Sequence, residues 1–278
     1  MAAPMTLSQY MSLKGPEPTA HVAYGSAPSQ YAELFKPAGD GPFPVVVLVH
    51  GGCWQTEYDG IKQFRNISGA LAAEGIAVWN VEYRRVDEAG GGFPGTQEDM
   101  IAALDALVAN AKSYQLDLGR LAAVGHSAGG YMVQWAAGRA RIPSTSSLYR
   151  AHPLVLHHVV SLGGINDLRA WSGICGFEVS KLTGTPSAVR ADVFRDTNPA
   201  ELIPNGSHTV LITGELDEQV PKETAFRFAE KAKASGDSAE VIVLPGASHF
   251  DEAAATSPSW NTTLSVIKNQ LGMIPSVR

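Results

Sequence analysis

A serine stands where a predicted strand turns into a predicted helix. Ser127 lies at the centre of Gly-His-Ser-Ala-Gly at 125–129, directly after the apolar run 121–124 and before a stretch of helical periodicity. A serine hydroxyl is a weak nucleophile, so an enzyme that uses it presents it on a sharp, uncrowded turn beside a base. Gly125 and Gly129 are expected because such a turn brings main chains too close together for a Cβ atom. The pattern predicts a nucleophilic serine, although alone it also fits a glycine-rich turn without chemistry.

Three carboxylates follow another predicted strand. The strand 209–214 leads into a loop that carries Glu215, Asp217 and Glu218. Open parallel sheets gather their functional side chains at the carboxyl ends of the strands, so one of these acids is placed to meet the serine. We expect Asp217 to accept the Nδ1 hydrogen of a histidine and to hold its productive tautomer. Glu215 and Glu218 are the alternatives, and a solvated acidic loop is the other interpretation.

A histidine follows the last predicted strand. His249 lies on the loop after the strand 240–244. We expect it to act as general base toward Ser127 and then as general acid toward the leaving group. A lone loop histidine is usually polar surface, but this one completes the order serine, aspartate, histidine along the chain that a hydrolase of this strand pattern requires.

A histidine and two glycines follow the apolar run 45–49. Attack by a serine creates a tetrahedral oxyanion, and preorganised N–H groups around it commonly contribute about 3 kcal/mol. We expect these donors to be the backbone N–H groups of Gly52, Cys53 and Ala128. A His-Gly-Gly loop is used for its amides, so His50 is expected to brace the loop rather than to act as a base.

Two aromatic side chains next to these groups are candidates for substrate binding. His126 directly precedes the nucleophile, and Trp54 directly follows the glycine loop. For Trp54, a wall of the acyl pocket and plain core packing are equally open interpretations.

The segments that position these groups alternate between strand and helix patterns. The predicted strands are 32–35, 45–50, 76–83, 120–125, 157–163, 209–214 and 240–244. The predicted helices are 61–73, 98–111, 130–140, 222–234 and 260–270. This rhythm is typical of a mostly parallel α/β sheet with helices on both faces. Residues 166–205 lie between two strands, lack clear periodicity, and are expected to form a small cap over the site, held in place by Trp171 and Phe177.

Composition limits the classes of function. The chain has 278 residues, of which 45% are hydrophobic and 17% charged, as expected of one large globular domain over 1–278. The net charge is −6 and no block of lysines and arginines occurs, which argues against a nucleic acid or an anionic membrane as partner. No cysteine and histidine cluster has metal-ligand spacing, so neither a metal nor another cofactor is expected.

The sequence also suggests a compartment. Residues 1–15 lack a basic opening and a long apolar stretch, and the longest aliphatic run, 45–49, is too short to span a bilayer. A cytoplasmic protein is therefore the default expectation. Cys53 and Cys175 are too few for a disulfide framework and are expected to be free thiols.

With these residues in place, the chain resembles the α/β-hydrolases of the esterase and lipase group, which includes bacterial carboxylesterases and arylformamidases of the kynurenine formamidase type. The resemblance covers nearly the whole chain and rests on the loop His50-Gly-Gly-Cys-Trp-Gln55, on Tyr83-Arg84, on Phe93-Pro94 and on 125–130, in the expected order. Two positions depart from hormone-sensitive-lipase-like esterases. Those have a third glycine where this chain has Cys53 and usually an aspartate where it has His126, which points toward the formamidase and peptidase-like branches.

The resemblance implies a serine carboxylesterase that cleaves small or medium acyl esters through an acyl-enzyme intermediate. Hydrolysis of an aryl formamide such as N-formylkynurenine by the same residues is the alternative. A hydrolase-fold binding protein without catalysis is a third interpretation, but Ser127, Asp217 and His249 are all present, which argues against it. The expected partner is a small ester or formamide, with neither nucleic acid nor membrane involved; a homodimer is left open.

Overall fold

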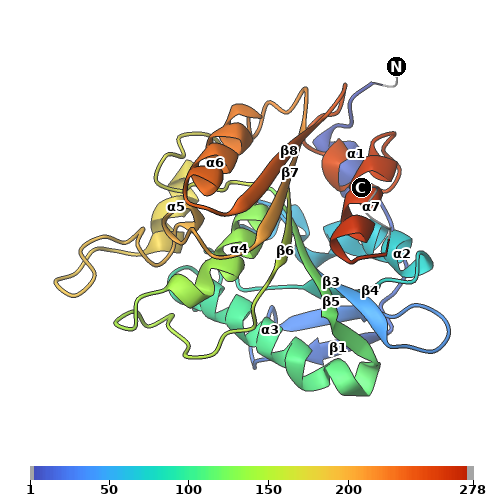
Figure 1. The fold of residues 1–278 in the computed structure, drawn as a ribbon, viewed down its shortest axis with the longest axis horizontal. Helices are drawn as coiled ribbons and strands as arrows, with labels where there is room; N and C mark the ends of the chain where they lie inside the picture. Colours follow the sequence, from blue (N-terminus) through green and yellow to red (C-terminus); the bar gives the residue numbers. More distant parts are fainter. Residues whose placement is uncertain (1–2, 274–278) are drawn as a thin grey trace.

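A computed structural model describes residues 3–273 and contains one eight-stranded sheet (Figure 1). The strands are β1 (Ala20–Ala23), β2 (Tyr31–Phe35), β3 (Phe43–Val49), β4 (Ala77–Val81), β5 (Leu116–His126), β6 (His158–Leu162), β7 (His208–Gly214) and β8 (Ser238–Leu244). Their order across the sheet is β1-β2-β4-β3-β5-β6-β7-β8. From β4 to β8 all neighbours run parallel, whereas β1 and β2 add antiparallel strands at one edge.

The central strands are buried on both faces because helices cover both faces. Along β3, Val45, Val47 and Val49 face one apolar core, while Val46 and Leu48 face the other. This explains why β3 is a continuous apolar run rather than an alternating one. The helices are α1 (Leu7–Met11), α2 (Arg65–Ala73), α3 (Gly95–Tyr114), α4 (Ala128–Ala137), α5 (Gly176–Thr183), α6 (Glu223–Ala234) and α7 (Trp260–Gln270).

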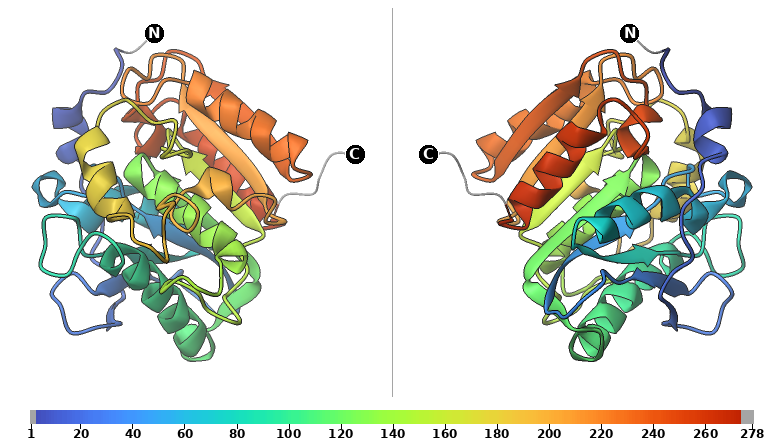
Figure 2. Two further views of the ribbon diagram at one scale, coloured as in Figure 1. Left: turned by 90° about the vertical axis from the view of Figure 1, so that its left-hand side faces the viewer. Right: turned by 90° about the vertical axis from the view of Figure 1, so that its right-hand side faces the viewer.

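The two cores separate the helices into two layers. Helices α3 and α4 contribute Leu104 and Met132 to the first core, and α6 packs its Phe228 on the same face of the sheet. Helices α2 and α7 contribute Leu71 and Ile267 to the second core. The two side views show α3, α4 and α6 on one face and α2 and α7 on the other (Figure 2).

Strand register brings the predicted site segments together. Val49 at the end of β3 pairs with Gly125 in β5, so the glycine loop begins beside the serine turn. Gly214 at the end of β7 pairs with Leu244 at the end of β8, so the loops that carry the acid and the histidine begin side by side. The site therefore lies at the carboxyl edge of the sheet, as parallel sheets require.

The expected α/β class is confirmed, with all seven predicted strands and all five predicted helices present. Of the strands and α-helices, three were not predicted: β1, α1 and α5, which have four, five and eight residues. Elements this short offer too few turns or alternations for a periodic signal. Within residues 3–273, no helix combines the length and apolarity needed to cross a membrane.

Candidate active site

Ser127 occupies a strained turn between β5 and α4. Its φ is 55° and its ψ is −119°, a conformation that a residue with a Cβ rarely adopts. Its backbone N–H donates to the carbonyl of Leu162 in β6 at 2.8 Å, and its own carbonyl accepts from Gly130 N–H at 3.0 Å. These hydrogen bonds hold the turn and leave the side chain at the surface of a pocket, where it is 4% exposed.

The glycines on either side of Ser127 are required by space, as predicted. A Cβ atom on Gly125 would collide with the carbonyl oxygen of Gly129, and one on Gly129 would collide with the carbonyl oxygen of Val49. Both contacts are with main chain, which cannot move aside as a flexible side chain can. The elbow thus packs directly on the end of β3, from which the glycine loop departs.

His249 and Asp217 form a buried pair. His249 Nδ1 lies 2.8 Å from Asp217 Oδ2, and the two residues are 4% and 7% exposed. Asp217 Oδ1 accepts two further hydrogen bonds, from the backbone N–H groups of Gln219 and Val220, both at 2.8 Å. A carboxylate with these partners is fixed in orientation and requires His249 Nδ1 to carry the proton, which leaves Nε2 free to accept one.

The other two acids of the loop point elsewhere. Glu215 is exposed and accepts from the backbone N–H of Gly246 at 2.9 Å, and Glu218 is exposed. The structure therefore brings Asp217, and neither Glu215 nor Glu218, to His249.

The glycine loop has an unusual backbone at three consecutive residues. Gly52, Cys53 and Trp54 have φ values of 98°, 51° and 55°. Gln55 N–H closes the turn on the carbonyl of Gly52 at 2.8 Å. Successive amides in such a conformation point to one side and form a concavity that attracts an anion.

All three expected oxyanion donors are free in the described part of the chain. The backbone N–H groups of Gly52, Cys53 and Ala128 make no hydrogen bond to an acceptor among residues 3–273. Ala128 is the first residue of α4, where the helix dipole also favours negative charge. Gly51 packs against Ser127, since a Cβ on it would lie 2.9 Å from Ser127 Cβ, so this loop and the elbow are in contact.

His50 braces the glycine loop from beneath, as expected. The ring is fully buried and stacks on Tyr83 with centroids 4.5 Å apart. Its Nδ1 lies 2.8 Å from the carbonyl of Gly51 and its Nε2 lies 2.7 Å from Glu82 Oε1. Burial would raise the pKa of Glu82, but the charge and hydrogen bond of His50, the charge of Arg85 and the backbone N–H of Ile61 hold it below its ordinary value.

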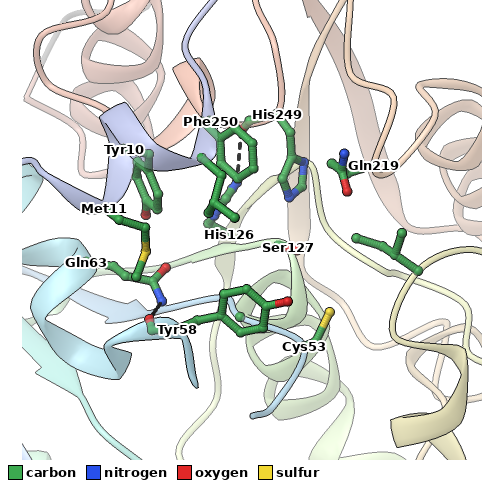
Figure 3. A pocket seen from close by; sticks show the side chains of 13 residues that line it. Tyr10, Met11, Cys53, Tyr58, Gln63, His126, Ser127, Gln219, His249 and Phe250 are labelled. Atoms are coloured by element: carbon green, nitrogen blue, oxygen red, sulfur yellow. Dashed lines mark hydrogen bonds between the residues drawn. The ribbon is translucent and has the colours of Figure 1, made fainter. Parts of the chain in front are cut away.

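The site opens into a small apolar cavity of about 80 Å³. Figure 3 shows His249, Tyr58 and Cys53 around Ser127. Helix α1 closes one side of this cavity through Leu7, Tyr10 and Met11. Phe250 also lines the cavity and stacks on Tyr10. The remaining lining residues are Gly52, Gln63, His126, Ile174 and Gln219.

A family model matches residues 33–232, which include the glycine loop, the serine turn and Asp217. The chain belongs to the BD-FAE family. The matched region ends before His249, which the fold supplies from the loop after β8.

Several known proteins are similar to this BD-FAE chain. A probable isoprenylcysteine alpha-carbonyl methylesterase of Arabidopsis thaliana is 27% identical over 256 residues, which cover 83% of this chain and 56% of that protein. An uncharacterized peptidase of Bacillus subtilis is 25% identical and covers 78% of this chain and 33% of its own length. The chain thus spans between a third and just over half of the length of these relatives.

Solved structures with the same fold cover most of the chain. Esterase B from Lactobacillus rhamnosis superimposes with a TM-score of 0.79 at 19% identity, over 96% of this chain and 90% of that one. Thermogutta terrifontis esterase 2 phosphonylated by sarin gives a TM-score of 0.75 at 20% identity, over 94% and 98%. The fold of this BD-FAE chain is the α/β-hydrolase fold.

Trp54 does not reach the pocket, so the expectation that it binds substrate is wrong. Its side chain is fully buried in the first core and meets Tyr131 edge-on with centroids 5.4 Å apart. The positive φ at Trp54 turns the side chain under the loop. Packing, the other interpretation of this residue, is what the structure has.

The expectation of free thiols is also wrong. Cys53 and Cys175 form a disulfide with Cα atoms 5.1 Å apart, although 122 positions separate them in sequence. Cys175 lies directly before α5. The disulfide therefore ties the glycine loop to the segment 166–205.

The two aromatic residues expected to anchor that segment, Trp171 and Phe177, differ in their burial, and a third side chain of the segment reaches the cavity. Ile174 lines the cavity. Trp171 is partly buried against the first core and donates from Nε1 to the carbonyl of Ile174 at 2.6 Å. Phe177, expected to anchor the segment, is 72% exposed and does not do so, because it lies on the outer face of α5.

The ring of His126 lines the cavity, and its Nε2 forms a hydrogen bond with the main chain of the protein. Its Nε2 lies 2.9 Å from the carbonyl oxygen of His249. Among residues 3–273, His126, His249 and Glu252 are the one group with metal-ligand spacing, their atoms all lying within 4.8 Å. Each histidine uses one ring nitrogen in a hydrogen bond to protein, His126 its Nε2 and His249 its Nδ1.

Sequence reasoning missed two kinds of site residue. The α1 side chains come from a five-residue helix whose position depends on distant packing. Glu252 lies three residues after His249, fully buried, and no motif marked it. An acid so close to a candidate catalytic histidine was the one available signal.

Proposed function

We propose that this chain hydrolyses carboxylic esters with short acyl groups through an acyl-enzyme on Ser127. The observation that carries the proposal is the pocket shared by Ser127, on its strained turn, and His249, whose Nδ1 is bound to a buried aspartate. The similarity to a protein described as a probable methylesterase supports an ester as substrate.

Acylation uses the free nitrogen of the imidazole. Ser127 Oγ attacks the acyl carbonyl carbon while His249 Nε2 takes the hydroxyl proton. The carbonyl π electrons move to oxygen, and that oxyanion accepts hydrogen bonds from the N–H groups of Cys53 and Ala128, with Gly52 as the third candidate donor. The carbon–oxygen bond to the alcohol then breaks, and His249 returns the proton to the leaving alkoxide.

Deacylation repeats these steps with water. His249 Nε2 takes a proton from the water that attacks the acyl carbon, and the second tetrahedral intermediate releases the carboxylic acid as Ser127 Oγ regains a proton. Asp217 stays ionised and stabilises the imidazolium in each step.

The cavity favours a short acyl group. A site for one water needs about 10 to 15 Å³, so a cavity of about 80 Å³ has room for several heavy atoms rather than a long chain. Its lining by Tyr10, Met11, Ile174 and Phe250 suits an alkyl group. We therefore expect acetyl to butyryl esters to react best.

The segment 166–205 serves in this proposal as a small cap on a single catalytic domain. The disulfide from Cys175 to the glycine loop and the contact of Ile174 with the cavity support this role. The disulfide also bears on location, because such bonds persist in oxidising compartments. It favours an oxidising compartment over the cytoplasm that the sequence led us to expect.

Labelling and a substrate panel test the proposal. A fluorophosphonate should modify Ser127, identified by peptide mass, and Ser127→Ala should lower turnover about 10⁴-fold or more on p-nitrophenyl acetate. The panel runs from acetyl to decanoyl esters beside N-formylkynurenine. An adduct on another serine in active protein contradicts the assignment, and faster turnover of the formamide than of any ester makes the protein an arylformamidase instead.

A further inference from the structure

A second carboxyl group lies at the acid end of the candidate triad. Glu252, in the short helix η5 (Asp251–Ala253), is fully buried. Its Oε1 accepts from the backbone N–H of Gly214 at 2.5 Å, at the end of the strand that leads to Asp217. Its Oε2 is buried and has no hydrogen-bond partner in the described part of the chain. Burying a carboxyl oxygen without a hydrogen-bond partner costs free energy, unless the oxygen is protonated and donates its hydrogen to a nearby acceptor.

Gly163 shows where that oxygen points. This residue directly follows β6 and has a φ of 48°. A Cβ atom on it would collide with Glu252 Oε2 and would lie 2.9 Å from His249 Nδ1 and 3.0 Å from Asp217 Oδ2. Glu252 Oε2, His249 Nδ1 and Asp217 Oδ2 therefore all lie close to the position that a side chain at residue 163 would occupy, and glycine leaves this space to them.

The charges around Glu252 favour its neutral form. The titratable groups that face it are Asp217, His249, His126 and Asp251. Burial raises the pKa of Glu252 well above its ordinary value, and the negative charge of Asp217 raises it further. No arginine or lysine is among these groups, and Asp217 already pairs with His249. Two carboxyl groups that share a buried site repel each other when both are ionised, so Asp217 and Glu252 are expected to carry one negative charge in total.

We propose that Glu252 is a positioning residue that stays protonated and presents its Oε2 hydrogen to Asp217 Oδ2. In this arrangement Asp217 keeps the negative charge and its hydrogen bonds from the backbone on one oxygen, while Glu252 and His249 both donate to the other. Asp217 is then held on every side in the orientation that fixes the tautomer of His249. The inference rests on the proposed hydrolase function for its role, but the protonation of Glu252 does not depend on that function.

Replacing Glu252 by glutamine and by leucine tests whether its carboxyl group acts as a neutral hydrogen-bond donor or as a negative charge. Glu252→Gln keeps an oxygen for Gly214 N–H and places an NH₂ donor where the carboxyl hydrogen was. It should retain kcat on a short ester within about threefold and leave the acid limb of kcat/KM in place. Glu252→Leu removes both interactions and should lower kcat about 10- to 100-fold, because a loosened Asp217 misplaces the base. Glu215→Gln, which alters an exposed carboxylate on the same loop as Asp217, is the matched control.

Three outcomes would overturn the proposal. If the acid limb of Glu252→Gln moves down by about one pH unit, Glu252 is ionised in the native protein, since removal of a nearby negative charge makes imidazolium easier to deprotonate. Equal kcat for the glutamine and leucine variants means that Glu252 positions nothing. Infrared difference spectra of wild type against Glu252→Gln at neutral pH check the proton independently of activity: a protonated carboxyl C=O band lost in the variant supports the proposal, and its absence contradicts it even if the wild type proves to have another activity.

Discussion

The imidazole of His126 donates from Nε2 to the main-chain carbonyl of His249, 2.9 Å away. The carbonyl has no hydrogen, so the nitrogen must supply it. The residue before the candidate nucleophile thereby holds the loop that carries the candidate base, across 123 positions of sequence. Hormone-sensitive-lipase-like esterases usually have an aspartate at the position of His126. In this chain the histidine at that position forms a hydrogen bond with the backbone of the His249 loop.

This bond predicts a pH dependence of stability. Burial lowers the pKa of His126 well below its ordinary value, and His249 lowers it further. Below a pH of about 6.5 the unfolded chain takes up a proton that the native ring refuses, so stability falls as pH falls, by up to about 1.4 kcal/mol per pH unit. His126→Gln keeps a donor for the carbonyl of His249 and removes this titration. Urea unfolding at pH 7.5, 6.5 and 5.5 should give a steeper loss for wild type; parallel losses would contradict a neutral buried His126.

The carboxylates of the loop after β7 should differ sharply in their effect on turnover. Asp217→Ala should lower kcat about 10⁴-fold, because the imidazole loses its tautomer and the imidazolium its partner. Glu215→Ala and Glu218→Ala remove exposed groups and should stay within about threefold of wild type. Measurement of kcat on one acetyl ester decides. If the Glu215 or Glu218 variant loses most of its activity while the Asp217 variant keeps it, Asp217 is not the acid that orients His249.

The disulfide provides a matched pair of variants. If Cys53 contributes only its backbone N–H, Cys53→Ser and Cys175→Ser should behave alike, since each removes the same crosslink. Closing a loop of this length contributes about 5 kcal/mol by chain entropy, so both variants should unfold at lower urea concentration, and the double variant should lose no more than either. Acetyl ester hydrolysis should persist in all three. Loss of activity in Cys53→Ser alone would make the sulfur of Cys53 part of the chemistry.

The cap segment should set acyl length. Ile174→Ala removes a branched side chain from the wall of the cavity and should shift the optimum toward longer acyl chains, while acetyl ester turnover stays within about tenfold of wild type. Phe177→Ala, on the same segment but 72% exposed, is the control and should leave the profile unchanged. The measurement is kcat/KM on p-nitrophenyl esters from acetyl to decanoyl. An unchanged profile for Ile174→Ala would place the acyl group elsewhere.

Local patterns in the sequence determined the sheet and the order of the chemistry. Continuous apolar runs such as 45–49 are recognisable because helices cover both faces of a parallel strand. Gly125 and Gly129 are readable as a tight turn because close main-chain approach excludes every other residue. Strand ends then placed Ser127 and the loops of the acid and the histidine at one edge.

The tertiary structure decided what depends on distant neighbours. Which of three adjacent acids meets His249, and whether Trp54 faces the cavity or the core, depends on backbone turns that propensity does not encode. The Cys53–Cys175 bond and the convergence of Glu252 on Gly163 arise only when the strand order brings separate loops together. Periodicity reports on neighbours along a strand or helix, whereas these contacts are set by the packing of loops that follow different strands.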